Sequence, residues 1–106
     1  MVGLFDYNPV LILEALSQAG KLGEIAVVGF DEEDETLQAI KDGHAHGTVV
    51  QDPYDYGYQS VKMLNALANG DDSSIPEGKF ISIPARQIRK DTVDEFWIEK
   101  NKKLGK

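Results

Sequence analysis

The sequence contains no cysteine, so disulfides, thiol catalysis and thiolate metal sites are excluded. It is also poor in positive charge: 11 Lys and Arg residues stand against 18 Asp and Glu residues, for a net charge of −7. This balance argues against nucleic acid or an anionic membrane as a partner, because both require clustered basic residues. No apolar run approaches the roughly 20 residues of a membrane-spanning helix, so membrane insertion is not expected.

The beginning of the chain lacks the basic start and long apolar stretch of a secretion signal. A length of 106 residues is enough for one compact domain and too short for two. We therefore expect a single domain over residues 1–106.

Three apolar runs are typical of strands buried in a parallel sheet, and each is followed by a polar joint and a helical pattern. The runs are residues 2–5, 25–30 and 47–50. The helices are expected to begin with Asn8 as cap and Pro9 as first residue, within residues 33–42, and after Asp52-Pro53. They are expected to end at Gly20, Gly43 and Asn69-Gly70. The repetition predicts successive βα units.

The pattern changes after Gly70. Residues 71–78 read as a polar loop, and residues 80–83 alternate apolar and polar as an edge strand does. Thr92 and Glu95 fit a capping box at the start of a final helix. The predicted fold class is therefore α/β, with three layers: a parallel sheet with helices on both faces.

Polar side chains follow the three predicted parallel strands at their carboxyl ends, where ligands gather in such sheets. A carboxylate accepts paired hydrogen bonds from neighbouring hydroxyls, an amide donates and accepts, and an aromatic ring covers an apolar sugar face. Such a set suits a neutral sugar or polyol better than a phosphate. The candidate ligand-binding residues are Phe5, Asp6, Tyr7, Asn8, Asp31 and Gln51.

Each of these polar residues also has a structural interpretation. Asn8 and Asp52 each precede a proline, which favours helix capping for both. Gln51 precedes its own cap, where a structural role gives no reason for an amide.

No metal or cofactor site is predicted. The acidic run of residues 31–35 lacks the glycine and distant glutamate of a calcium loop, and His44 and His46 have no further ligand nearby in the sequence. Asp6 and Asp31 could pair as in a glycosidase. Nothing else in the sequence supports catalysis, and we expect no enzyme.

Several segments in order carry a family resemblance: VVGFD at 27–31, AIKDG at 39–43 and TVVQDPYDYGYQSV at 48–61. With them, most of residues 2–70 resembles the C-terminal lobe of periplasmic sugar-binding proteins of the ribose-binding type. These proteins serve ABC transporters and share their fold with the effector domains of LacI-type repressors. The resemblance covers only the last part of that lobe.

The resemblance implies that Asp31 and Gln51 hydrogen-bond sugar hydroxyls. The family places a binding Asn after the first strand, where this sequence has Phe5-Asp6-Tyr7-Asn8. Asp6 or Asn8 could substitute for that Asn, or an aromatic ring of this stretch could stack on the sugar. The resemblance also implies a periplasmic or other extracytoplasmic location and an ABC transporter permease as partner.

Because the resemblance omits the upstream strands, residues 2–5 are expected to form an open sheet edge, and we expect a homodimer joined there. Three alternative functions remain open. They are the effector-binding part of a LacI-type regulator, a small carboxylate glycosidase, and a self-associating fragment without a ligand.

Overall fold

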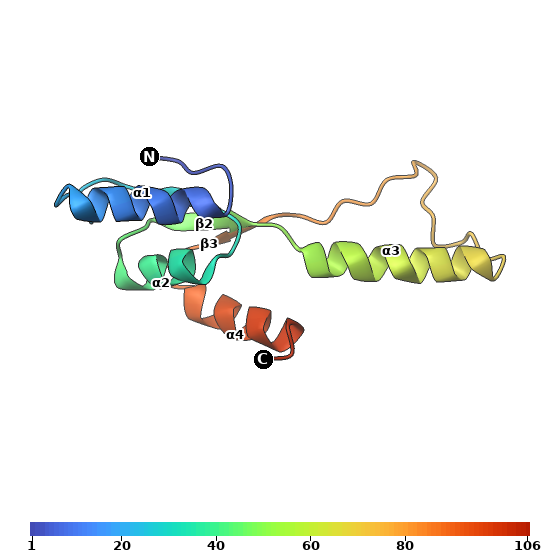
Figure 1. Cartoon of the computed structure of the whole chain (residues 1–106). Coiled ribbons are helices and arrows are strands. Elements are labelled where there is room, and N and C mark those ends of the chain that lie inside the picture. The colour runs from blue at the N-terminus through green and yellow to red at the C-terminus, as the bar shows by residue number, and fades with distance from the viewer. The chain divides into compact units, whose positions relative to one another are not determined.

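A computed structural model describes residues 1–106. Its residues group into two compact units: unit 1 comprises residues 1–50 and 86–106, and unit 2 comprises residues 51–85. The elements are α1 (Tyr7–Gln18), β1 (Val28–Phe30), α2 (Asp34–Asp42), β2 (Gly47–Val50), α3 (Pro53–Ala68), β3 (Arg86–Ile88) and α4 (Val93–Lys103), and all except β1 are labelled in Figure 1. None of these helices combines the length and the apolar character that crossing a bilayer requires.

Unit 1 contains a three-stranded sheet in the order β1-β2-β3. β1 and β2 are parallel, which confirms the predicted βα unit with α2 between two parallel strands, but β3 runs antiparallel to β2. The sheet is therefore mixed rather than all-parallel. The expected strand at residues 2–5 is reduced to one parallel bridge between Val2 and Val28, with Gly3 N–H donating to the Val28 carbonyl at 2.9 Å.

The last strand lies later in the chain than the alternation predicted. Residues 80–83 form no strand, and Phe80 is 76% exposed. The pairing partner of β2 is instead β3, in which Ile88 lies opposite Thr48 and is buried. Alternation marks a chain that could be half-buried, whereas pairing depends on which segment reaches the free edge of β2.

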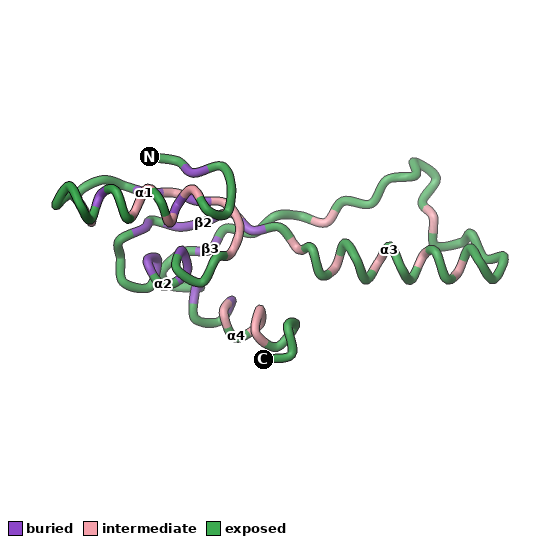
Figure 2. The backbone as a smooth tube through the Cα atoms, in the orientation of Figure 1, coloured by how far each residue is buried: buried purple, intermediate pink, exposed green.

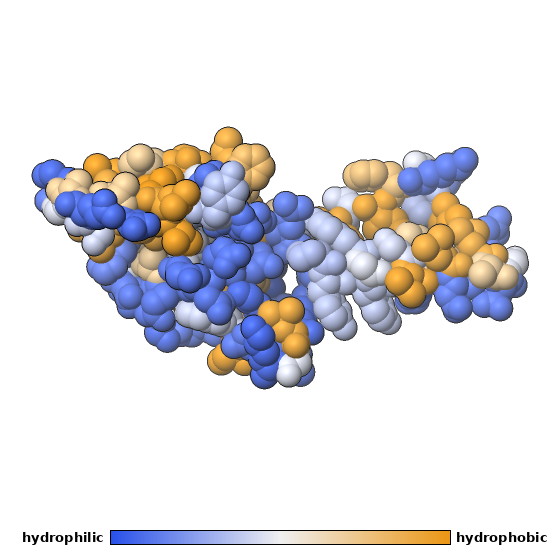
Figure 3. Space-filling view, in the orientation of Figure 1, coloured by the Kyte–Doolittle hydropathy of each residue, from blue (hydrophilic) through white to orange (hydrophobic).

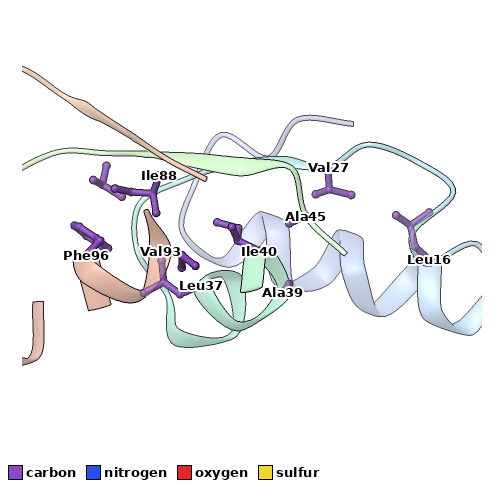
Figure 4. Close-up of a cluster of buried hydrophobic side chains, with 10 residues drawn as sticks. Leu16, Val27, Leu37, Ala39, Ile40, Ala45, Ile88, Val93 and Phe96 are labelled. Atoms are coloured by element: carbon purple, nitrogen blue, oxygen red, sulfur yellow. The ribbon is translucent and has the colours of Figure 1, made fainter. Parts of the chain in front are cut away.

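One face of the sheet is covered by α1, α2 and α4, and the core lies between these helices and the strands (Figure 4). Gly29, Thr48 and Ile88 lie in register on this face. Gly29 must lack a side chain, because a Cβ there would lie 2.6 Å from the Pro9 ring of α1. The buried apolar residues all belong to unit 1 (Figure 2): Leu16, Val27, Leu37, Ala39, Ile40, Ala45, Val50, Ile88, Val93 and Phe96.

The other face of the sheet in unit 1 is not packed by these helices. Phe30, Val49 and Gln87 lie in register there, since neighbouring residues of a strand point to opposite faces. Phe30 and Val49 are half-buried and Gln87 is exposed. Within unit 1, the expectation of helices on both faces is therefore not met.

The helix termini agree with the sequence pattern at some ends only. α2 ends at Gly43 with φ +85°, the left-handed stop that was predicted. α1 begins earlier than predicted, at Tyr7, and its cap is Asp6 rather than Asn8. The predicted capping box is wrong, because Thr92 makes no side-chain cap hydrogen bond; its hydroxyl contacts the backbone of Arg89 instead.

Unit 2 consists of α3 and the extended segment that follows it. The Asp52 carboxylate accepts from Asp55 N–H at 3.0 Å, which confirms the predicted cap, and Pro53 opens the helix. α3 has no buried residue. An apolar groove of about 510 Å³ separates it from residues 75–83, with Met63, Leu67 and Ile83 among its lining residues.

Candidate functional site

Asp31 stands at the carboxyl end of β1 and is half-buried. Its backbone is held by the end of β2: Asp31 N–H donates to the Val49 carbonyl at 2.9 Å, and its carbonyl accepts from the Thr48 hydroxyl at 2.8 Å. Its φ is +66°, a left-handed value that is uncommon outside glycine. No hydrogen bond or ion pair engages its carboxylate. The side chain is therefore free to accept hydrogen bonds from a ligand.

Thr48 is the residue that sequence reasoning missed. The sequence pattern treats residues 47–50 as one apolar run. Thr48 nevertheless carries a hydroxyl and is only 2% exposed, on the covered face of the sheet. The available signal was a single hydroxyl among apolar neighbours, because a buried hydroxyl needs a partner. That partner is the carbonyl of Asp31.

Residues 5–8 form the turn that leads into α1, in which Asn8 N–H donates to the Phe5 carbonyl at 2.9 Å. The Asn8 side-chain oxygen accepts from Leu4 N–H at 3.2 Å and from Phe5 N–H at 3.0 Å. The prediction that Asn8 caps α1 is therefore wrong. Its side-chain oxygen is also occupied by these two backbone N–H groups and is not free for a ligand. Asp6 is likewise engaged, since its carboxylate accepts from Tyr7 N–H at 2.7 Å.

The two aromatic residues of this turn stack on each other. The rings of Phe5 and Tyr7 lie 5.9 Å apart between centroids, with 4° between their planes. Phe5 is 60% and Tyr7 56% exposed. An exposed, ordered aromatic pair of this kind can cover an apolar sugar face, which neither ring could do if it were packed in the core.

Gln51 follows β2 directly and is the first residue of unit 2. Its side chain is exposed and makes no hydrogen bond within the chain. Its amide can therefore donate to and accept from a ligand.

The loop after Asp31 is fixed to α4 by Lys100. The Lys100 ammonium donates to the Glu32 carbonyl at 2.6 Å and to the Asp34 carboxylate at 2.7 Å. This hydrogen bond and the positive charge of Lys100 lower the pKa of Asp34. The Lys100 charge is thereby paired with the Asp34 carboxylate.

The acidic residues 31–35 do not form a metal site. No group of three or more His, Asp and Glu side chains is arranged to hold a metal ion, and His44 and His46 are both exposed. The Asp31 carboxylate is free for a ligand, and the turn that leads into α1 separately exposes an aromatic pair.

Comparison with known proteins points in one direction. The family model described as a periplasmic binding protein domain matches residues 2–72. A search of curated protein sequences finds no match.

Solved structures similar to this chain include solute-binding proteins. GanP, a glucose-galactose binding protein from Geobacillus stearothermophilus, is 28% identical with a TM-score of 0.74 over 85% of this chain. An ABC transporter solute-binding protein from Agrobacterium vitis with bound D-fucose is 30% identical, with a TM-score of 0.75 over 89% of this chain. Another from the same organism, bound with alpha-D-tagatopyranose, is 25% identical with a TM-score of 0.75 over 94%.

The chain spans about a third of the length of these structures, 31%, 31% and 33% respectively. The similarity therefore concerns about one third of each of these larger solute-binding proteins.

Proposed function

This chain belongs to the periplasmic binding protein domain family, a family of binding proteins, and from that premise we propose that it recognises a sugar or related polyol. It acts as part of the substrate-binding component of an ABC sugar transporter. The single observation that carries the proposal is the unpaired Asp31 carboxylate at the carboxyl end of β1. Ligands of open α/β sheets bind at such strand ends.

Gln51 is the second proposed ligand contact. β1 and β2 are parallel neighbours, and Gln51 is the residue that follows β2. A carboxylate accepts hydrogen bonds, and an amide both donates and accepts them, so both groups suit the hydroxyls of a sugar.

The turn of residues 5–8 contributes mainly through its rings in this proposal. Asp6 and the Asn8 oxygen already accept backbone hydrogen bonds, whereas Phe5 and Tyr7 are exposed and stacked. We therefore assign the aromatic pair to stacking against the sugar and leave Asp6 and Asn8 to shape the turn. The remaining lone pairs of Asp6 and the Asn8 amide nitrogen are secondary contacts.

Affinity should be low for this chain by itself, because a third of a relative's length desolvates little of a sugar. The permease of the transporter is the partner implied for a longer protein, and the setting is periplasmic or otherwise extracytoplasmic.

Thermal-shift and calorimetric titration with glucose, galactose, D-fucose, D-tagatose and D-arabinose tests the function. We expect saturable binding of at least one sugar that Asp31→Asn and Gln51→Ala each weaken by about tenfold or more. Asp91→Asn, at an exposed carboxylate on another part of unit 1, is the charge-matched control and should bind as the unmodified chain does. Absence of binding to every sugar, or equal binding by the Asp31 variant, contradicts the proposal.

The second proposal is that the chain associates as a homodimer. Apolar side chains at the N-terminal edge of the sheet favour it. Met1, Val2, Leu4 and Phe5 are 59%, 60%, 65% and 60% exposed, and apolar surface gathers over α1 and this segment (Figure 3). Exposed apolar patches beside an open strand edge favour association.

Light scattering after size-exclusion chromatography tests the dimer. Leu4→Lys should shift the chain toward monomer, whereas Leu104→Lys, at a residue 57% exposed at the end of α4, should not. A monomer at every concentration contradicts this candidate and leaves sugar recognition unaffected.

A further inference from the structure

Asp31 adopts a backbone conformation that costs free energy for any residue with a Cβ atom. Positive φ angles occur at five glycines of this chain and at only two other residues, Asp31 and Lys79. Glycine would relieve the strain at position 31, and yet the chain carries aspartate there. Strain of this kind persists only where the surrounding structure holds it in place.

The surroundings that hold it belong to β2. The Thr48 hydroxyl donates to the Asp31 carbonyl at 2.8 Å, and Asp31 N–H donates to the Val49 carbonyl at 2.9 Å. Both polar groups of the Asp31 peptide backbone are thus fixed by two consecutive residues of the neighbouring strand. The first of these bonds depends on a side chain and can be removed by substitution.

Thr48 has no evident need of its hydroxyl for packing. It is 2% exposed on the covered face of the sheet, between Gly29 and Ile88 in register. Valine has nearly the same shape and would fill that space without a polar atom. The hydroxyl is satisfied by Asp31 alone among the hydrogen bonds of the chain, so its specific effect falls on the conformation of that residue.

We propose that Thr48 is a positioning residue for ligand recognition: its hydroxyl holds Asp31 in the left-handed conformation and thereby fixes the direction of the carboxylate. This inference rests on the proposed function, which assigns that carboxylate to the sugar. Without the hydroxyl, φ at Asp31 relaxes toward ordinary negative values, and the Cα–Cβ bond turns away from the direction that the ligand requires.

Binding measurements with the sugar that stabilises the chain best in the panel above provide the first arm. Thr48→Val should lower affinity about fivefold to tenfold, the usual effect of losing one hydrogen bond. Thr48→Ser, which restores the hydroxyl, should return affinity to within about twofold of the original. Thr92→Val removes another hydroxyl that contacts a backbone carbonyl, that of Arg89, and should leave affinity unchanged.

Backbone NMR couplings of Asp31 without any sugar provide the second arm. They should report positive φ in the unmodified chain and in Thr48→Ser, and loss of positive φ in Thr48→Val. Thr48→Ala serves in place of Thr48→Val should the latter not fold. This arm separates the two proposals. A chain that binds no sugar contradicts the proposed sugar recognition. The φ angle of Asp31 in Thr48→Val still shows whether the Thr48 hydroxyl holds that conformation.

Two results overturn the inference. One is a Thr48→Val chain in which Asp31 keeps its positive φ. The other is a Thr48→Val chain that is less stable to urea but binds sugar as tightly as before, which is the behaviour of a residue with a structural role alone.

Discussion

The two units of this chain contrast in how their helices are stabilised. In unit 1, α2 buries Leu37 and Ile40 completely against the sheet and α4. In unit 2, α3 is the longest helix of the chain, with 16 residues, and buries none of them. Figure 2 shows the same contrast along the backbone, with buried residues confined to unit 1.

The difference separates local from tertiary stabilisation. α3 has every local helix signal: an Asp52 cap, Pro53 in the first turn, and Gly70 with φ +76° beyond its end. These signals fix where a helix begins and ends, but most of the stability of a helix in a protein comes from burying an apolar face. Unit 1 has that burial and unit 2 does not.

The largest expected difference between the units comes from a pair of leucines. Leu37→Ala in α2 should lower the free energy of unfolding by about 3 kcal/mol, because a fully buried leucine leaves a cavity. Leu64→Ala in α3 should change it by less than about 0.5 kcal/mol, because that side chain is 64% exposed. Urea unfolding followed by circular dichroism measures both, and equal losses would show that α3 has a buried face after all.

Two glycines should respond with opposite signs. Gly29→Ala should destabilise unit 1 by about 1–3 kcal/mol, because the new Cβ meets the Pro9 ring at 2.6 Å. Gly57→Ala should stabilise α3 by about 0.5–1 kcal/mol, because nothing lies within 4 Å of the new Cβ and alanine favours a helix interior. Amide hydrogen exchange resolves each helix separately. A loss of protection in α3 of Gly57→Ala would contradict an open helix face.

The smallest effect concerns pH and the ion pair that fixes α4 to the loop before α2. The pKa of Asp34 is lowered below its ordinary 3.8 by the hydrogen bond from Lys100. A lowered folded-state pKa stabilises the fold above pH 3.8, and this contribution disappears as pH falls through the folded value. Because the Asp34 side chain is 58% exposed, we expect at most about 1 kcal/mol.

Lys100→Met should remove that part of the pH dependence. Glu99, whose pKa is lowered by the hydrogen bond from Arg86, should retain its own part. Urea unfolding between pH 7 and pH 3 measures the change. An unchanged pH profile in Lys100→Met would contradict the role of the Lys100–Asp34 pair. Asp71→Asn, in unit 2, is the control and should leave the unfolding midpoint unaltered.

Sequence reasoning located what depends on neighbouring residues. The helices after Asp31 and Asp52, and the stops at Gly43 and Gly70, follow from apolar periodicity, capping and left-handed glycine. The parallel pairing of β1 and β2 also follows, because a short helix between two apolar runs leaves little choice of topology.

What the sequence did not reveal depends on distant partners. β3 is a strand because Ile88 pairs opposite Thr48, whereas the local alternation of apolar and polar residues favoured residues 80–83. Asn8 precedes a proline as a cap does, yet its oxygen turns back to Leu4 and Phe5. The strained backbone of Asp31 and its hydrogen bond from Thr48 likewise join residues 17 positions apart.

The central claim is that Asp31 and Gln51 bind a sugar, and an NMR titration of the unmodified chain tests it most directly. Adding millimolar sugar to isotope-labelled protein should move the amide signals of Asp31 and Gln51 along a saturating curve, together with those of Phe5 and Tyr7. Signals in α4 near Leu104 should stay in place. Saturating shifts confined to other parts of the chain, or no shift with any sugar of the panel, would contradict the account.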